Sequence, residues 1–149
     1  MNNNLLPSDR VTVAAAIDPD ATVASTVASS WVSMSDYANI MAVVMAGTLG
    51  ASATIDAKLE QATDAAGTGA KDITGKAITQ LTQAGTDDSG KQVTLNCRAD
   101  ELDVENSFTH VRLSITVAVA TSDIGGIVLG LDARYQPATD STTVAEVVA

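Results

Sequence analysis

The sequence predicts an all-β protein: an antiparallel β-sandwich or barrel-like domain with an extended N-terminal arm. Apolar and polar residues alternate with a period of two over residues 54–61 and 111–119, as in strands with one buried face. The hydrophobic content of 46% comes mainly from Ala, Val, Ile and Leu, and small or β-branched side chains suit strands. No long amphipathic helical pattern separates these segments. Six or seven strands divided by turn signals favour a sandwich or a barrel.

Residues 1–30 differ from the rest and predict the extended arm. The stretch "VTVAAAIDPDATVASTVASS" is low in complexity, has no helical stripe and contains a proline. We expect this arm to be ordered only where it lies on something else, either as a loose leader or as a tether to a neighbouring subunit. The side chains expected to make protein contacts are Leu5, Leu6, Val11, Val13, Val23 and Trp31.

The domain proper is expected over residues 31–137. Trp31 opens it, and either core packing or a subunit contact would explain this single tryptophan. The largely apolar run "NIMAVVMAGTL" predicts a strand buried on both faces. The segment "ATIDAKLEQATD" predicts a half-solvated strand, with Ile55, Ala57 and Leu59 on its buried face. Glycine-containing loops at 65–75 and 84–91 follow, and "QVTLNCRADEL" predicts a further strand.

Residues 110–137 predict a hairpin of two strands joined by "TSDIGG". In the first strand the apolar face is expected to hold Val111, Leu113, Ile115, Val117 and Val119. In the return strand Ile127, Leu129, Leu131 and Ala133 are expected to continue that face. Pro137 ends the strand because proline cannot donate to a ladder. Residues 138–149 form a polar C-terminal tail, which could be a last strand or another arm.

The charge balance excludes two classes of partner. Eight basic residues against eighteen acidic ones give a net charge of −10. Binding to nucleic acid depends on neutralising phosphates with Lys and Arg, so we expect no nucleic-acid partner. The chain also lacks the basic patch that draws proteins to anionic membranes. The apolar run "ANIMAVVMAGTLGASATI" is interrupted by Gly, Ser and Thr, so a strand, a turn and a second strand explain it better than a membrane span. The N-terminus has no basic region followed by a long apolar stretch, so we expect no signal peptide and no membrane partner.

Motifs that carry chemistry are missing from the sequence. His110 is the only histidine, and Cys97, the only cysteine, is expected to be a buried small residue. No G-x-S-x-G motif is present, and "GTGAKDITGKAIT" does not fit a phosphate-binding loop. The acidic stretches "DPD", "DD" and "DELDVE" do not match a calcium loop, although a site built from distant loops stays open. Paired carboxylates for glycoside hydrolysis also stay open. We expect no enzyme, and no catalytic, cofactor-binding or metal-binding residue.

The order and texture of the strands resemble small structural proteins of tailed bacteriophages. The resemblance rests on "SSWVSMSDYANIMAVVMAGTL", "ATIDAKLEQATDAAGTGAKDITGKAITQL", "FTHVRLSITV" and "VLGLDARYQPAT", and it covers roughly residues 29 to 140. It implies a virion component, and first a capsid decoration (cement) protein. Such a protein would bind the major capsid protein on the outer surface of the capsid, as a homotrimer. The alternatives are a head–tail connector, neck or tail subunit and, in another class, a carbohydrate-binding or carbohydrate-active β-sandwich protein.

Overall fold

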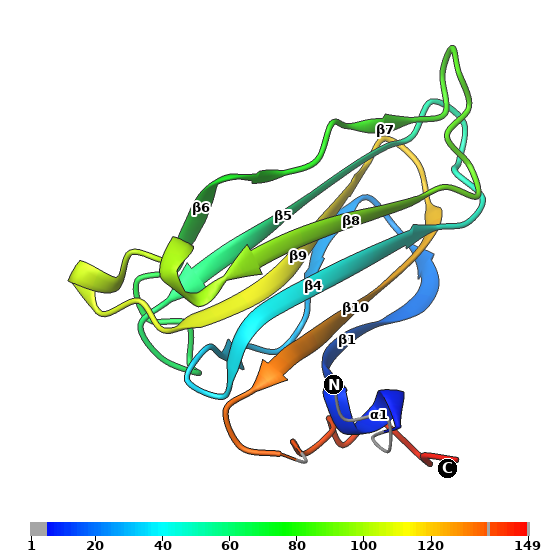
Figure 1. Cartoon of the computed structure of the whole chain (residues 1–149). Coiled ribbons are helices and arrows are strands. Elements are labelled where there is room, and N and C mark those ends of the chain that lie inside the picture. The colour runs from blue at the N-terminus through cyan, green and yellow to red at the C-terminus, as the bar shows by residue number, and fades with distance from the viewer. Residues whose placement is uncertain (1–5, 137, 149) are drawn as a thin grey trace.

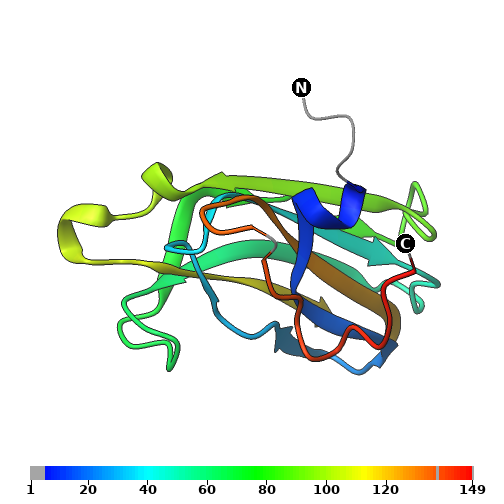
Figure 2. The same cartoon turned by 60° about the horizontal axis from the view of Figure 1, so that its bottom comes forward.

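The computed structural model describes residues 6–136 and 138–148, which form two antiparallel sheets packed face to face (Figures 1 and 2). Sheet A has the order β1 (Val11–Thr22), β10 (Ser122–Ala133), β4 (Tyr37–Ala46), β8 (Gln92–Arg98). Sheet B has the order β2 (Ser25–Ala28), β9 (His110–Ala118), β5 (Thr54–Ala62), β6 (Lys71–Ala77), with β3 (Val32–Ser33) on β9 and β7 (Leu81–Thr82) on β5. The helices are one-turn pieces: α1 (Pro7–Arg10), η1 (Ala99–Glu101) and η2 (Val104–Asn106). The predicted all-β sandwich is confirmed.

The pairing of the strands follows a simple rule. Leaving aside the two-residue strands β3 and β7, the first strand pairs with the last and each later strand pairs inward in turn: β1 with β10, β2 with β9, β4 with β8 and β5 with β6. These are the pairs of one long antiparallel ribbon. The ribbon is then wrapped so that β10 pairs with β4 and β9 with β5. Eight strands wrapped in this way form a jelly roll.

The core between the sheets is built by the alternation that the sequence shows. On β5, Ile55 and Leu59 are fully buried, and on β9 so are Leu113 and Ile115. The predicted buried faces of these two strands are therefore confirmed, except at Val119, which follows the end of β9 and is 68% exposed. The prediction that β4 is buried on both faces is wrong, because no layer of the described chain covers the outer side of sheet A. Met45, for example, is 55% exposed.

The predicted hairpin over 110–137 is also wrong. Its two strands, β9 and β10, lie in different sheets, so residues 119–121 cross between the layers. The face of the return strand is reversed as well: Ile124 and Val128 point inward and are buried, whereas Ile127 and Leu129 are partly exposed on the outside. The reason is that small residues occupy inward positions of β10, where larger side chains from other strands fill the space.

Gly126 and Gly130 are those small inward positions. A β-carbon at Gly126 would lie 2.7 Å from Cδ2 of Leu113 on β9, and one at Gly130 would overlap the ring of Tyr37. Neighbours from other strands thus take the room that these glycines leave. Because Ile127, Leu129 and Leu131 lie on the outer face of β10 and two of its inward positions are glycines, counting large apolar residues selects the wrong face.

The structure also corrects the expectation of a core-less arm over residues 1–30. From Val11 to Ala28 the chain forms β1 and β2, each paired within its own chain. Ala15 is fully buried and Ile17 is 9% exposed, so β1 contributes to the core. The sequence of β1 does not show a clear alternation of buried and exposed residues, because it contains a run of alanines and because the register of β1 is irregular after Val13 and after Ile17. Whether this segment also contacts a neighbouring chain stays a prediction.

The C-terminal tail lies along β1 (Figure 2). The backbone N–H of Val13 donates to Oδ1 of Asp140 at 2.8 Å, and the carbonyl of Val13 accepts from the N–H of Ser141 at 2.7 Å. Residues 138–148 form no strand. The tail nevertheless satisfies backbone groups at the edge of sheet A, and such edges otherwise invite pairing with other chains.

Candidate interaction surface

The outer face of sheet A is apolar across three adjacent strands. Residues paired across an antiparallel ladder point to the same side, so the register defines this face. Met41 pairs with Leu129 and Val43 with Ile127, while Val13 pairs with Leu129 from the other side. The apolar residues of the outer face of sheet A are Val11, Val13, Ala16, Met41, Val43, Met45, Ile127, Leu129 and Leu131.

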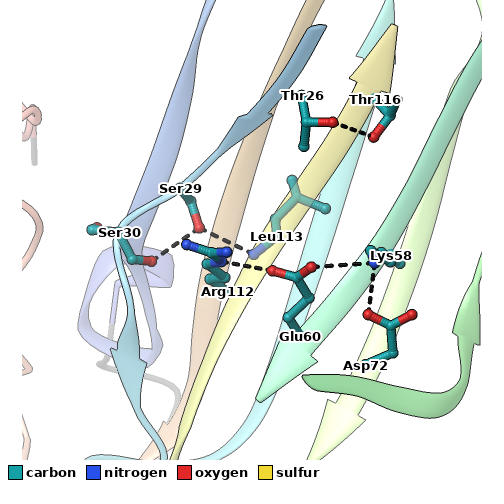
Figure 3. A network of polar contacts seen from close by, with 9 residues as sticks. All are labelled: Thr26, Ser29, Ser30, Lys58, Glu60, Asp72, Arg112, Leu113 and Thr116. Carbon is teal, nitrogen blue, oxygen red and sulfur yellow. Dashed lines mark hydrogen bonds and ion pairs between the residues drawn. The ribbon is translucent and has the colours of Figure 1, made fainter. Parts of the chain in front are cut away.

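The outer face of sheet B is polar, as Figure 3 shows. Glu60 on β5 accepts from Nε of Arg112 on β9 at 2.8 Å and lies 3.2 Å from Nζ of Lys58. Lys58 in turn lies 2.6 Å from Asp72 on β6. Beyond this network, further along β9, the hydroxyls of Thr26 and Thr116 share a hydrogen bond of 2.8 Å. The two outer faces thus differ in polarity. The polar side chains of sheet B are hydrogen-bonded to one another, whereas sheet A presents apolar side chains to solvent.

One end of sheet A carries an open groove of about 770 Å³. The register of β1 against β10 is irregular between Ile17 and Asp20, so Asp18 and Pro19 have no partner in the ladder. Proline is tolerated at such a bulge because it has no N–H to donate. The Cα of Pro19 lies 3.0 Å from the position of a β-carbon on Gly125, so the bulge rests directly on β10. The groove is lined by Ala16, Ile17, Asp18, Pro19, Asp20, Ala21, Met45, Ala46, Gly47, Asp123, Ile124, Gly125, Gly126 and Ile127.

Several acidic residues lie at this end of sheet A. Asp18, Asp20 and Asp123 line the groove. At the same end of the sheet, Asp87 and Asp88 lie in the loop before β8, and the one ammonium group of that loop, Lys91, lies 2.7 Å from Asp88. The pKa values of Asp87 and Asp88 are lowered, chiefly by hydrogen bonds from Ser89 and Lys91 respectively, so these groups stay ionised. The apolar groove is therefore set in a negative potential.

The titratable groups that catalysis would use are dispersed. His110 on β9 shares a hydrogen bond of 2.9 Å with the neighbouring Thr109 hydroxyl. Cys97 on β8 is buried in the other sheet, as expected, and burial raises the pKa of its thiol to about 11. Within residues 6–136 and 138–148, no group of three or more His, Cys, Asp or Glu side chains could hold a metal ion. In the same ranges no helix is long and apolar enough to cross a membrane.

The predicted contact residues do not form one surface. Val11 and Val13 lie on the outer face of sheet A. Leu6, before α1, is 44% exposed, and Val23, between β1 and β2, is 63% exposed. Trp31 is partly exposed beside sheet B, with the guanidinium of Arg112 over its ring. Leu5 lies outside the described residues.

Most of the outer face was missed by reasoning from the sequence. The sequence pattern predicts that Met41, Val43 and Met45 form one side of a doubly buried strand and that Ile127 and Leu129 are core residues. The signal was present, because an apolar run can equally mark a strand with one face in the core and the other on a partner. Nothing in the run itself separates the two cases.

No protein-family model matches the chain, and no curated protein matches it. Three solved structures that are similar to this chain come from virus particles. A chain of broad bean stain virus has a TM-score of 0.49 at 11% identity, covering 99% of this chain and 97% of that one. A chain of an empty cowpea mosaic virus-like particle has a TM-score of 0.47 at 9% identity, covering 95% and 89%. A chain of infectious bursal disease virus, Gt strain, has a TM-score of 0.41 at 12% identity, covering 91% of this chain and 36% of that one. At such low identities and TM-scores, neither kinship nor function follows from these likenesses.

Proposed function

We propose that this chain is a structural protein of a virus particle that binds its partner through the outer face of sheet A. The observation that carries the proposal is the contrast between the two sheets. Sheet B turns a hydrogen-bonded polar network to solvent, whereas sheet A turns nine apolar residues outward, with Met45 55% exposed. Contiguous apolar surface of this kind marks interaction sites in soluble proteins.

The proposal in its specific form is a capsid decoration (cement) protein on the outer surface of the shell, bound to the major capsid protein. Three points support it: the strand texture of tailed-phage structural proteins, a jelly-roll fold of a kind found in capsid proteins, and dispersed titratable groups. A net charge of −10 suits a position away from packaged nucleic acid. A ligand that binds only the assembled lattice stabilises it by mass action. A homotrimer at local three-fold positions is the assembly that we propose.

The experiment adds purified protein to particles that lack it and counts bound copies by quantitative mass spectrometry. Leu129→Lys places a charge in the middle of the outer face of sheet A, and Thr116→Lys places the same charge on the outer face of sheet B. We expect Leu129→Lys to abolish binding and Thr116→Lys to retain it, with both variants showing wild-type circular dichroism. Equal binding by the two variants would contradict the proposed face.

The copy number tests the specific form. On the order of hundreds of copies per particle indicates a shell protein, whereas about six or twelve indicates a ring at the neck or tail. A specific signal on a glycan array that Leu129→Lys leaves unchanged would instead favour the carbohydrate-binding class.

A further inference from the structure

The groove beside the Pro19 bulge differs chemically from the rest of the outer face of sheet A. Its floor and walls are mainly apolar or glycine, with Met45 and Ile127 on one side and Pro19 on the other. Its rim carries Asp18, Asp20 and Asp123. Along the rest of the outer face, two carboxylates are already hydrogen-bonded: Asp132 accepts from the side-chain amide of Asn39, and Asp140 accepts from the backbone N–H of Val13, both at 2.8 Å.

From this combination we propose that the groove binds a short apolar peptide segment flanked by lysine or arginine, contributed by the protein on which this chain sits. This inference rests on the proposed function, which places the partner protein in a virus particle. Apolar side chains of the segment would cover Met45, Ile127 and the glycine floor. Its basic flanks would lie against Asp18 and Asp123. Complementary charge at the rim guides encounter and selects the partner, while the apolar contacts supply most of the affinity.

The charge of the groove disfavours a second copy of this chain, nucleic acid or anionic lipid as its occupant. A second copy of this chain placed face to face would bring the same three aspartates together, and like charges at an interface are strongly unfavourable. Phosphate groups of nucleic acid or of anionic lipid meet the same repulsion. The loop before β8 adds Asp87 and Asp88 to this end of the sheet, and Lys91 is already bonded to Asp88.

The direct test is a titration of the free protein with two peptides, followed by NMR. Both have Val-Leu-Val-Leu at the centre; one has a pair of lysines at each end and the other a pair of glutamates. We expect the lysine peptide to shift the amide signals of Gly125, Gly126 and Met45, with an affinity that falls as salt is added. The glutamate peptide should leave them unchanged. Equal shifts with both peptides, or no shift with either, would overturn the inference.

Two pairs of variants locate the binding. Asp18→Asn with Asp123→Asn removes two rim charges, and Glu105→Gln with Glu146→Gln removes two charges elsewhere. We expect the rim pair to weaken lysine-peptide binding by about threefold to tenfold, the range for two exposed charge contacts, and the control pair to change it little. Met45→Ser should weaken binding and Val104→Ser should not, although these side chains are similarly exposed, at 55% and 60%. If neither variant of the groove alters binding, the peptide lies elsewhere and the inference is wrong.

Sedimentation of the same variants tests the second-copy alternative. We expect the Asp18→Asn and Asp123→Asn pair to leave the oligomeric state as in the wild type. A tighter self-association in this variant would assign the groove to a second copy and overturn the inference. The peptide titration uses no particles, so its result is independent of the particle-binding assay. If the titration fails while Leu129→Lys still abolishes particle binding, only the inference about the groove is overturned. If the titration succeeds while Leu129→Lys leaves particle binding unchanged, only the proposed face is overturned.

Discussion

The guanidinium of Arg112 lies over the ring of Trp31, with 4.5 Å between its central carbon and the ring centre, while its Nε donates to Glu60 at 2.8 Å. Arg112 therefore contacts the ring of Trp31 while its hydrogen bond to Glu60, in the polar network of sheet B, fixes the position of the guanidinium. Gly67 also lies close to the indole, since a β-carbon there would lie 2.7 Å from Nε1 of Trp31. Trp31 is thus an anchor between a loop and a sheet, with only part of its ring in solvent.

Gly67→Ala should destabilise the protein more than Gly85→Ala. Both glycines have positive φ, +85° and +82°, so both substitutions meet the same backbone penalty of about 1–2 kcal/mol. Only Gly67 has the indole in the way, which adds about 1–3 kcal/mol of overpacking. Urea unfolding of the two variants gives the difference directly. Equal losses would mean that Trp31 moves aside freely and anchors nothing.

Val119→Gly should stabilise the protein. Val119 has φ +73° although it is β-branched, and it is 68% exposed, so its side chain gains little from burial. Such backbone strain costs about 1–3 kcal/mol, whereas the extra unfolded-state freedom of glycine costs about 0.5–1 kcal/mol. The net expectation is a gain of about 0–2.5 kcal/mol in the free energy of unfolding. The control is Val23→Gly, at a similarly exposed valine without positive φ, which should destabilise.

Cys97 should resist alkylation in the folded protein. Burial, with the nearby Glu101 carboxylate, raises the pKa of its thiol from 9.0 to about 11. At pH 8 the thiolate fraction is then roughly a hundredfold below that of an unperturbed thiol. The side chain is also 1% exposed. Iodoacetamide labelling followed by mass spectrometry should be slow in buffer and fast in urea. Rapid labelling in buffer would mean that β8 opens readily.

Acid should destabilise the protein partly through Glu101. A hydrogen bond from the backbone N–H of Arg98 lowers the pKa of this carboxyl, and Lys76 lowers it further. A group whose pKa is lower in the folded state stabilises it above the unfolded pKa, near 4.5, and loses that contribution as the pH falls through the folded pKa. Glu101→Gln should therefore reduce stability at pH 7, and the difference from wild type should vanish near pH 2. Urea midpoints at several pH values give this profile, with exposed Glu105→Gln as the control. A difference that persists at pH 2 would show that the effect is not ionisation.

The residues predicted to make contacts and the outer face of sheet A have Val11 and Val13 in common. Those two residues are apolar and lie in a segment whose sequence shows no alternating buried face. Met41 and Leu129 are apolar within strong strand patterns, which predict core positions for both. Sequence pattern alone ranks residues by hydrophobicity, and hydrophobicity does not distinguish the inside of a sandwich from an exposed sheet face. The groove was not predictable, because Pro19, Met45 and Gly125 come from three strands that only the register brings together.

The sequence by itself determined that β4, β5, β8, β9 and β10 are strands and, on β5 and β9, which face is buried over most of its length. Alternation is a local property, so Ile55 with Leu59 and Leu113 with Ile115 could be read from their own neighbours. Only the tertiary structure decided which sheet each strand joins and which face of β10 is inside. Strand partners such as β1 and β10 are more than a hundred residues apart, and Gly126 and Gly130 face inward because Leu113 and Tyr37 fill the space beside them. Pairing and packing of this kind are set by contacts between distant segments, which no local period encodes.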